Sequence, residues 1–259
     1  MTLKRFTFLA PAFLAALACL ATTSAVDAAG WGSVKGKFVI KGDAPKPILQ
    51  IKKGDAAVKD AAVCAADNLN RNDLVIDQKT GGIQHIFIYL RKAPKDVHPD
   101  LEKAKLPELK QDQKGCRFLP HTMFVRTGQD VRIISNDPVA HNTHGTFFKN
   151  PPFNQTVAAS DNKVGLVKSF KLGESLPMPI VCDIHPHMKS HWLILDHPYA
   201  AITNAKGEFE IKNLPEGDHK FRVWHEKAGL LERSWKVSIK DGKVTEMKTE
   251  EVAPKEFED

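Results

Sequence analysis

Short runs of alternating apolar and polar residues, separated by turn residues, recur through the sequence. They are IFIYL at 86–90, VRIIS at 131–135, WLILD at 192–196, HKFRVWH at 219–225 and SWKVSI at 234–239. A period of two is typical of β-strands with one buried face, and long stretches with helical periodicity are few. The sequence therefore predicts a mainly β protein, built as one large β domain or two small ones.

The first 29 residues have the pattern of a secretory signal peptide. Lys4 and Arg5 precede an apolar run, and small residues follow it. Pro11 interrupts the run, which is shorter than the roughly 20 residues that a membrane-spanning helix needs. Cys19 could mark a lipoprotein, but this interpretation is less well supported. A leucine usually stands three residues before the lipid-bearing cysteine, and this sequence has Ala16 there. We expect a periplasmic or secreted protein without a permanent membrane span.

The charge distribution narrows the choice of partners. The formal net charge is +6, and the basic residues are interspersed with acidic ones along the whole chain. Nucleic-acid binding is disfavoured, because the basic residues form no cluster with interleaved aromatic residues. A modestly basic surface would instead attract an acidic protein partner at low salt.

One stretch, IVCDIHPHMKSHW at 180–192, contains an unusual set of potential metal ligands. Cys182, His185 and Met188 offer a soft thiolate, an imidazole and a weak thioether donor within one loop. A mononuclear copper centre uses this set together with a second imidazole, which His141 or His144 offers just after the run at 131–135. Zinc also binds Cys and His, but a thioether favours copper.

The paired motifs HNTH at 141–144 and CDIHPHM at 182–188 resemble the copper-binding motifs of the cupredoxin family, of the amicyanin and plastocyanin type. The resemblance covers about 115–198 and implies a Greek-key β-sandwich that binds one type 1 (blue) copper ion. The ligands that it implies are His141, Cys182, His185 and Met188.

The resemblance also implies the surroundings of the copper ion. The backbone N–H of Asn142 would bond to the Cys182 sulfur, and His185 would present an exposed imidazole edge through which an electron passes. The nearby histidines, His144, His187 and His191, would surround the site without binding the metal.

Beyond the copper loop the sequence changes character. The run ITNAKGEFEIKNLPEGDHKFRVWHEK and the N-terminal Gly32 to Val39 resemble a transthyretin-like domain of carboxypeptidase regulatory modules, and Asp241-Gly242 predicts a closing hairpin. The expected organisation is a signal peptide (1–29), an N-terminal β region (30–92), a linker (93–114), a cupredoxin domain (115–198) and a transthyretin-like β domain (199–259). The copper domain is either inserted in the transthyretin-like domain or consecutive with it.

The remaining cysteines and histidines are given structural roles. Cys64 and Cys116 form a disulfide or remain two buried thiols, and the sequence leaves both open. Isolated histidines in apolar runs more often pack than bind metal, so we assign His85, His121 and the segment 224–226 to packing.

These features favour an exported copper protein that carries one electron between redox proteins. The alternatives are a copper storage or delivery protein, and a β-sandwich adhesion or carbohydrate-binding module without redox activity. An enzyme is disfavoured, because the sequence shows no Ser-His-Asp arrangement or paired carboxylates at a recognisable spacing.

Overall fold

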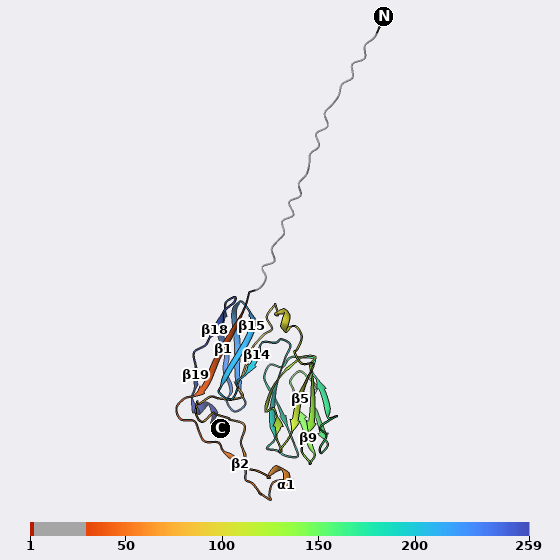
Figure 1. Ribbon diagram of the computed structural model, residues 1–259, viewed down its shortest axis with the longest axis vertical. Helices are drawn as coiled ribbons and strands as arrows, with labels where there is room; N and C mark the ends of the chain where they lie inside the picture. The colour runs from red at the N-terminus through yellow and green to blue at the C-terminus, as the bar shows by residue number, and fades with distance from the viewer. Residues whose placement is uncertain (3–29, 259) are drawn as a thin grey trace.

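The computed structural model describes residues 1–2 and 30–258, and it confirms the mainly β class. The predicted signal peptide and Cys19 lie outside the described residues. Figure 1 shows two β-sandwiches beside each other, one with red and blue strands and one with green and teal strands. Among the described residues, no helix is long and apolar enough to span a membrane.

The first sandwich combines strands from both ends of the chain. One of its sheets has the order β15 (Glu208–Pro215), β1 (Trp31–Ile40), β18 (Val244–Glu246), with β19 (Glu250–Val252) also paired to β1. The other has the order β14 (Ala200–Ile202), β4 (Phe87–Leu90), β16 (Gly217–His225), β17 (Gly229–Ile239). Because β1 pairs antiparallel with β15 and β4 with β16, the segments on either side of the second sandwich share one core.

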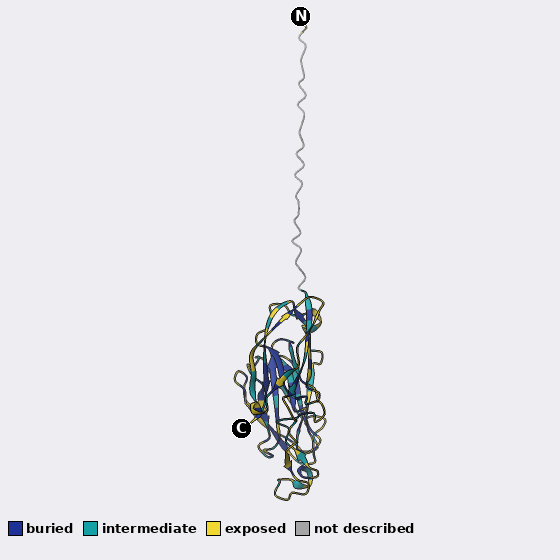
Figure 2. Ribbon diagram, turned by 90° about the vertical axis from the view of Figure 1, so that its left-hand side faces the viewer, coloured by how far each residue is buried: buried dark blue, intermediate teal, exposed yellow. Residues whose placement is uncertain are grey.

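The second sandwich holds the predicted copper motifs. One of its sheets has the order β10 (Phe153–Val157), β9 (His141–Gly145), β12 (Met178–Val181), β13 (Lys189–Leu195), β7 (Thr122–Arg126). The other has the order β11 (Leu166–Ser169), β8 (Asp130–Ser135), β5 (Glu108–Gln113), β6 (Phe118–Leu119). Trp192, Ile180 and Ile133 lie in the core between these sheets, and Figure 2 shows such buried positions along the strands.

The structure shortens the predicted linker 93–114, because its last part is strand β5, paired parallel with β8. The sequence of β5, ELKQDQ, did not predict a strand, because the residues at its inward positions are glutamines and not apolar residues. Gln111 accepts a hydrogen bond from the Trp192 indole N–H at 2.7 Å, and Gln113 donates one to the Thr143 hydroxyl at 2.7 Å. Both glutamines are fully buried, which such hydrogen bonds make tolerable.

The hairpin predicted at Asp241-Gly242 is wrong. The turn there does not return the chain beside β17. Instead β18 pairs parallel with β1, so the turn carries the chain from one sheet of the first sandwich to the other. Thus the turn signal identified a change of direction but not the partner strand.

A small lobe projects from the first sandwich and packs against the second (Figure 1). It contains β2 (Leu49–Ile51), the short helix α1 (Ala61–Cys64) and β3 (Leu69–Asn70). Cys64 and Cys116, for which the sequence left a disulfide and two thiols open, form a disulfide with a Cα–Cα distance of 5.1 Å, which ties this lobe to the second sandwich. The other helical segments of the described residues are two 3-10 turns, Pro99–Leu101 and Pro254–Phe257.

The two sandwiches meet through an apolar contact of their own. Phe87 and Tyr89 on β4 and Trp224 on β16 pack with Leu193 and Leu195 on β13. Each of these side chains is at most 9% exposed, so the junction is a continuous apolar core. Burial of this kind fixes the relative position of neighbouring strands, here β13 and β16.

Candidate metal centre

The structure brings the motif residues from three points of the chain into one buried cluster. His141 begins β9, Cys182 follows β12, and His185 lies in the loop between β12 and β13. The Nδ1 atoms of His141 and His185 are 2.9 Å apart, and Cys182 Sγ is 3.8 Å from His185 Nδ1. One ligand atom from each of the three lies within 4.8 Å of the others, and all three residues are at most 1% exposed.

Met188 closes the loop that carries these residues. Its backbone N–H donates to the His185 carbonyl at 2.9 Å, and the Cys182 N–H donates to the Met188 carbonyl at 3.2 Å. The side chain of Met188 is 1% exposed and belongs to the same core cluster as Cys182. The loop is therefore a tight turn, and the Met188 side chain is buried in the core beside Cys182.

Each imidazole is oriented by a carboxylate on its far side. His141 Nε2 is 2.8 Å from Asp137 Oδ2, and His185 Nε2 is 2.9 Å from Asp60 Oδ2. A carboxylate accepts an N–H, so these bonds keep the Nε2 protons in place and turn the two Nδ1 atoms toward each other. Once both Nδ1 atoms are deprotonated, two nitrogens directed at one point suit a shared cation, and carboxylate-oriented imidazoles are typical of metal sites. The donor set therefore fits a metal ion.

Asn142 and its neighbours prepare the thiol of Cys182. The Asn142 Oδ1 atom accepts hydrogen bonds from the Asp183 N–H at 2.7 Å and from the Cys182 thiol at 3.3 Å. Burial raises the pKa of Cys182, but hydrogen bonds from His141 and from the backbone at Asn142, His185 and Ile184 outweigh it and lower this pKa. The thiolate, which is the metal-binding form, is thus favoured.

The His141 imidazole beside Cys182 can hold a proton. Burial lowers the pKa of His141, but the hydrogen bonds with Asp137 and Cys182 more than compensate and raise it to about 9. In the metal-free protein, the His141 imidazole therefore holds a proton at neutral pH, beside a thiol whose pKa is lowered.

The expectation of an exposed His185 edge is wrong. His185 is 1% exposed, and its outer nitrogen bonds to Asp60 of the lobe that carries α1. Of the other predicted neighbours, His144 is half-exposed and contacts Asp183, whereas His191 lies in a separate cluster with Glu226 at the sandwich junction. The lobe thus covers the side of the site that we expected to be open.

Sequence reasoning missed both orienting carboxylates. Asp60 is 125 residues from His185 in the chain, and no local pattern connects them. Asp137 lies four residues before His141, in the run NDPVAH. This closeness to the first motif is the only feature of the sequence that could have indicated its role. Asp137 also accepts the backbone N–H groups of Gly115 and Cys116 at 2.6 and 2.8 Å.

We expect Asp137→Ala to destabilise the metal-free protein by about 3 kcal/mol, because it leaves the buried Cys116 N–H, the Gly115 N–H and the His141 imidazole without their acceptor. Urea unfolding followed by tryptophan fluorescence measures this change. Asp100→Ala is the matched control, since the Asp100 side chain is 82% exposed and the free energy of unfolding should stay within about 0.5 kcal/mol. Equal effects of the two substitutions would contradict the role given to Asp137.

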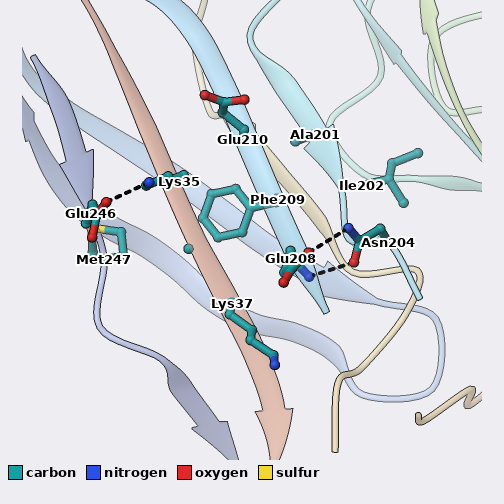
Figure 3. Close-up of a pocket in the computed structure, with 11 residues that line it drawn as sticks. Lys35, Lys37, Ala201, Ile202, Asn204, Glu208, Phe209, Glu210, Glu246 and Met247 are labelled. Carbon is teal, nitrogen blue, oxygen red and sulfur yellow. Dashed lines mark hydrogen bonds and ion pairs between the residues drawn. The ribbon is translucent and has the colours of Figure 1, made fainter. Parts of the chain in front are cut away.

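A large hollow lies elsewhere, on the first sandwich beside β1 and β15 (Figure 3). Its volume is about 740 Å³, and Lys35, Glu246, Asn204 and Glu208 are among the residues that line it. These polar groups are paired with one another: Lys35 with Glu246 at 2.6 Å, and Asn204 with Glu208 at 3.1 Å. The hollow offers less specific chemistry than the cluster around Cys182.

Comparisons with known proteins give weak structural likenesses. No protein-family model matches the sequence. No curated protein matches it either. A copper-containing nitrite reductase from Thermus scotoductus SA-01 is similar at 18% identity and a TM-score of 0.30, over 41% of this chain and 25% of the reductase. This chain thus spans about a quarter of the length of the reductase.

Two smaller proteins are also similar. A purple cupredoxin from Nitrosopumilus maritimus aligns at 14% identity and a TM-score of 0.28, over 34% of this chain and 99% of that protein. A reduced amicyanin mutant aligns at 16% identity and a TM-score of 0.30, over 36% of this chain and 87% of amicyanin. At these TM-scores the likenesses assign no function, so the interpretation of the site depends on its own geometry.

Proposed function

We propose that this protein is an exported one-electron carrier whose type 1 copper centre is held by His141, Cys182, His185 and Met188. The observation that carries the proposal is the convergence of two Nδ1 atoms and a buried sulfur, with each imidazole fixed from behind by a carboxylate. Copper bound there would supply reversible one-electron chemistry.

The residues around the site favour electron transfer over turnover of a substrate. Asn142, Asp137 and Asp60 hold the ligand side chains in place before any metal arrives, so little has to move when the charge of the site changes. The three converging ligands are enclosed, which leaves little access for a substrate. We therefore propose that the protein is a carrier and not an enzyme.

The enclosed site also bears on the alternatives. A storage or delivery protein must exchange its metal readily, and the lobe that covers His185 would slow such exchange. Adhesion or glycan binding would not require two imidazoles and a thiol inside a core. Both alternatives are therefore less well supported by the site than electron transfer.

The proposal also covers the location of the protein and the kind of redox partner that it meets. The predicted signal peptide would direct the chain to the periplasm or out of the cell, and the modest positive charge would favour an acidic redox protein as partner. The buried position of His185 moves the expected electron route outward through Asp60, whose side chain is 35% exposed. The transthyretin-like character of the first sandwich stays a prediction.

We expect the mature protein loaded with Cu(II) to show an intense thiolate-to-copper absorption band in the visible region. Cys182→Ser should abolish the band, because the charge-transfer donor is lost. His144→Gln is the matched control, since it replaces a half-exposed histidine of the same motif and should keep the band. A colourless wild-type protein, or a band that survives in Cys182→Ser, would contradict the proposal.

A further inference from the structure

A second cluster of potential metal ligands lies at the junction of the two sandwiches. His121 stands immediately before β7, His191 lies on β13, and Glu226 follows β16. His121 Nε2 contacts Glu226 Oε1, and His191 Nδ1 lies 3.4 Å from Glu226 Oε2. One ligand atom from each residue lies within 4.8 Å of the other two, so the three donors face a common point.

The three side chains are held in a nearly dry environment. Their exposed fractions are 6%, 12% and 6% for His121, His191 and Glu226. A carboxylate at this depth requires a compensating positive charge, because burial of an isolated charge is costly. A proton on one imidazole, the Arg71 and Lys189 side chains that line the same cavity, or a bound cation can supply that charge.

His121 has two neighbours at Nδ1 besides its contact with Glu226. Its Nδ1 atom is 3.1 Å from the Lys189 carbonyl oxygen, which can only accept a hydrogen bond, and 2.9 Å from the Asn72 amide nitrogen, which can only donate one. When Nδ1 donates to the carbonyl, the Nε2 lone pair points at the carboxylate of Glu226; when Nδ1 accepts from Asn72, Nε2 donates to Glu226. A bound cation would select the first arrangement, which is typical of a metal-binding imidazole.

His191 supplies an independent observation. Its Nδ1 atom is buried and has no hydrogen-bond partner, although Glu226 is close. A buried lone pair directed at a carboxylate is unfavourable unless a positive ion lies between them.

The fold fixes the spacing of the three donors. β7 and β13 pair in parallel, with Thr122 opposite His191, and the His191 N–H donates to the His121 carbonyl at 3.0 Å. The packing of Trp224 against the ring of His191, with centroids 5.1 Å apart, positions the segment that carries Glu226. His121 and His191 thus meet the turn that follows β16 at the junction of the two sandwiches.

A cavity of about 220 Å³ gives access to this cluster. Glu226, Asn72 and Lys189 line it, together with His187 from the copper loop. The cavity therefore touches Glu226 on one side and the loop of the first site on the other. Water or a small ligand could reach a metal ion at Glu226 from this space.

We propose that His121, His191 and Glu226 bind a divalent first-row transition-metal ion that keeps an open coordination position toward this cavity. Two imidazoles and one carboxylate suit Zn²⁺, Fe²⁺ or Cu²⁺, and three protein ligands leave room for water or a small ligand. The ion would join the two sandwiches, since Glu226 comes from the first and both histidines from the second. This site goes beyond the proposed electron-transfer function and does not depend on it.

In the test, the mature full-length chain is dialysed against Zn(II) alone. Elemental mass spectrometry then gives the number of metal ions bound per chain. We expect Glu226→Gln to bind one ion fewer per chain than the wild type, and Cys182→Ser to retain the ion that Glu226→Gln loses. The matched control is His197→Gln, which replaces another buried histidine outside the cluster and should bind as the wild type does. Equal binding by Glu226→Gln and the wild type would overturn the proposal and leave a buried ion pair.

A second measurement covers the case in which Glu226→Gln does not fold. Crystals of the wild-type chain soaked in Zn(II) should show an anomalous-scattering peak between His121, His191 and Glu226. A peak only at the Cys182 cluster would overturn this proposal while leaving the first site intact, and a peak only at the junction would do the reverse. The failures of the two sites are thus distinguishable.

Discussion

Lowering the pH from about 7.5 to about 5 is expected to destabilise the metal-free protein by on the order of 8 kcal/mol, which approaches the whole stability of a typical domain. Four buried histidines carry this effect: burial lowers the pKa of His85 to about 3, and the pKa values of His191, His197 and His225 to about 4. Each should contribute about 2 kcal/mol at this pH.

The sign follows from proton binding. Below the ordinary histidine pKa of 6.5, these residues become charged in the unfolded chain while they stay neutral in the folded one. The unfolded state then binds more protons, so acid favours it. The stability is fully present above about pH 6.5 and is lost as the pH falls toward 4. The surroundings of the cluster add to the effect, because His121 disfavours charge on His85 and His225, while Glu226 only partly offsets burial at His191.

Urea unfolding of the metal-free mature chain at a series of pH values checks this prediction. The slope of the free energy of unfolding against pH gives the number of protons taken up, which should approach four near pH 5. His197→Gln should remove about 2 kcal/mol of the acid effect, since an amide oxygen can still accept from the Tyr199 N–H but does not titrate. His144→Gln, at a half-exposed position, should leave the slope unchanged. A flat stability profile between these pH values would contradict the assignment.

Local patterns in the sequence were sufficient for the β class and for the expectation that His141, Cys182 and His185 lie together. The loop with Cys182, His185 and Met188 has its candidate ligands at short spacing, and a second imidazole had to come from a neighbouring strand, so topology left few choices. Strand β5 was missed because its inward residues are polar, and polarity pattern is the only signal that a single strand offers. Its role depends on Trp192 and Thr143, which are distant in sequence.

Long-range contacts account for the other failures. Asp60, His121 and Glu226 each have a partner more than 100 residues away, and nothing in the sequence near them indicates that partner. His121 and the segment 224–226 were assigned to packing because each offers too few ligands alone. Only the meeting of β7, β13 and β16 at the sandwich junction brings the three donors together.

Removal of the disulfide by the double substitution Cys64→Ser and Cys116→Ser is expected to cost about 4 kcal/mol of stability, because the bond closes a loop spanning 52 positions. The loss should fall mainly on the lobe with α1. This lobe has only two short strands of its own, so the disulfide is its main link to the second sandwich. Urea unfolding of the metal-free chain measures the change.

The same substitution should open the proposed copper site, which tests the covering role of the lobe. The disulfide connects the segment of Asp60, which holds His185, to Cys116, whose N–H is held by Asp137 together with His141. Without it the lobe can move away, and His185 gains access to solvent. We expect a chelator to remove copper at least about tenfold faster, since about 1.4 kcal/mol of lost lobe stability already gives a factor of ten.

The visible band of the double variant should persist, because all four proposed ligands remain. Asp60→Ala with an intact disulfide separates the two contributions: it removes the hydrogen bond to His185 but keeps the lobe in place, so copper release should quicken less than in the double variant. If both variants release copper at the wild-type rate, the lobe does not control access, and His185 must exchange its metal by another route. If Asp60→Ala is the faster of the two, the hydrogen bond and not the covering lobe protects the site.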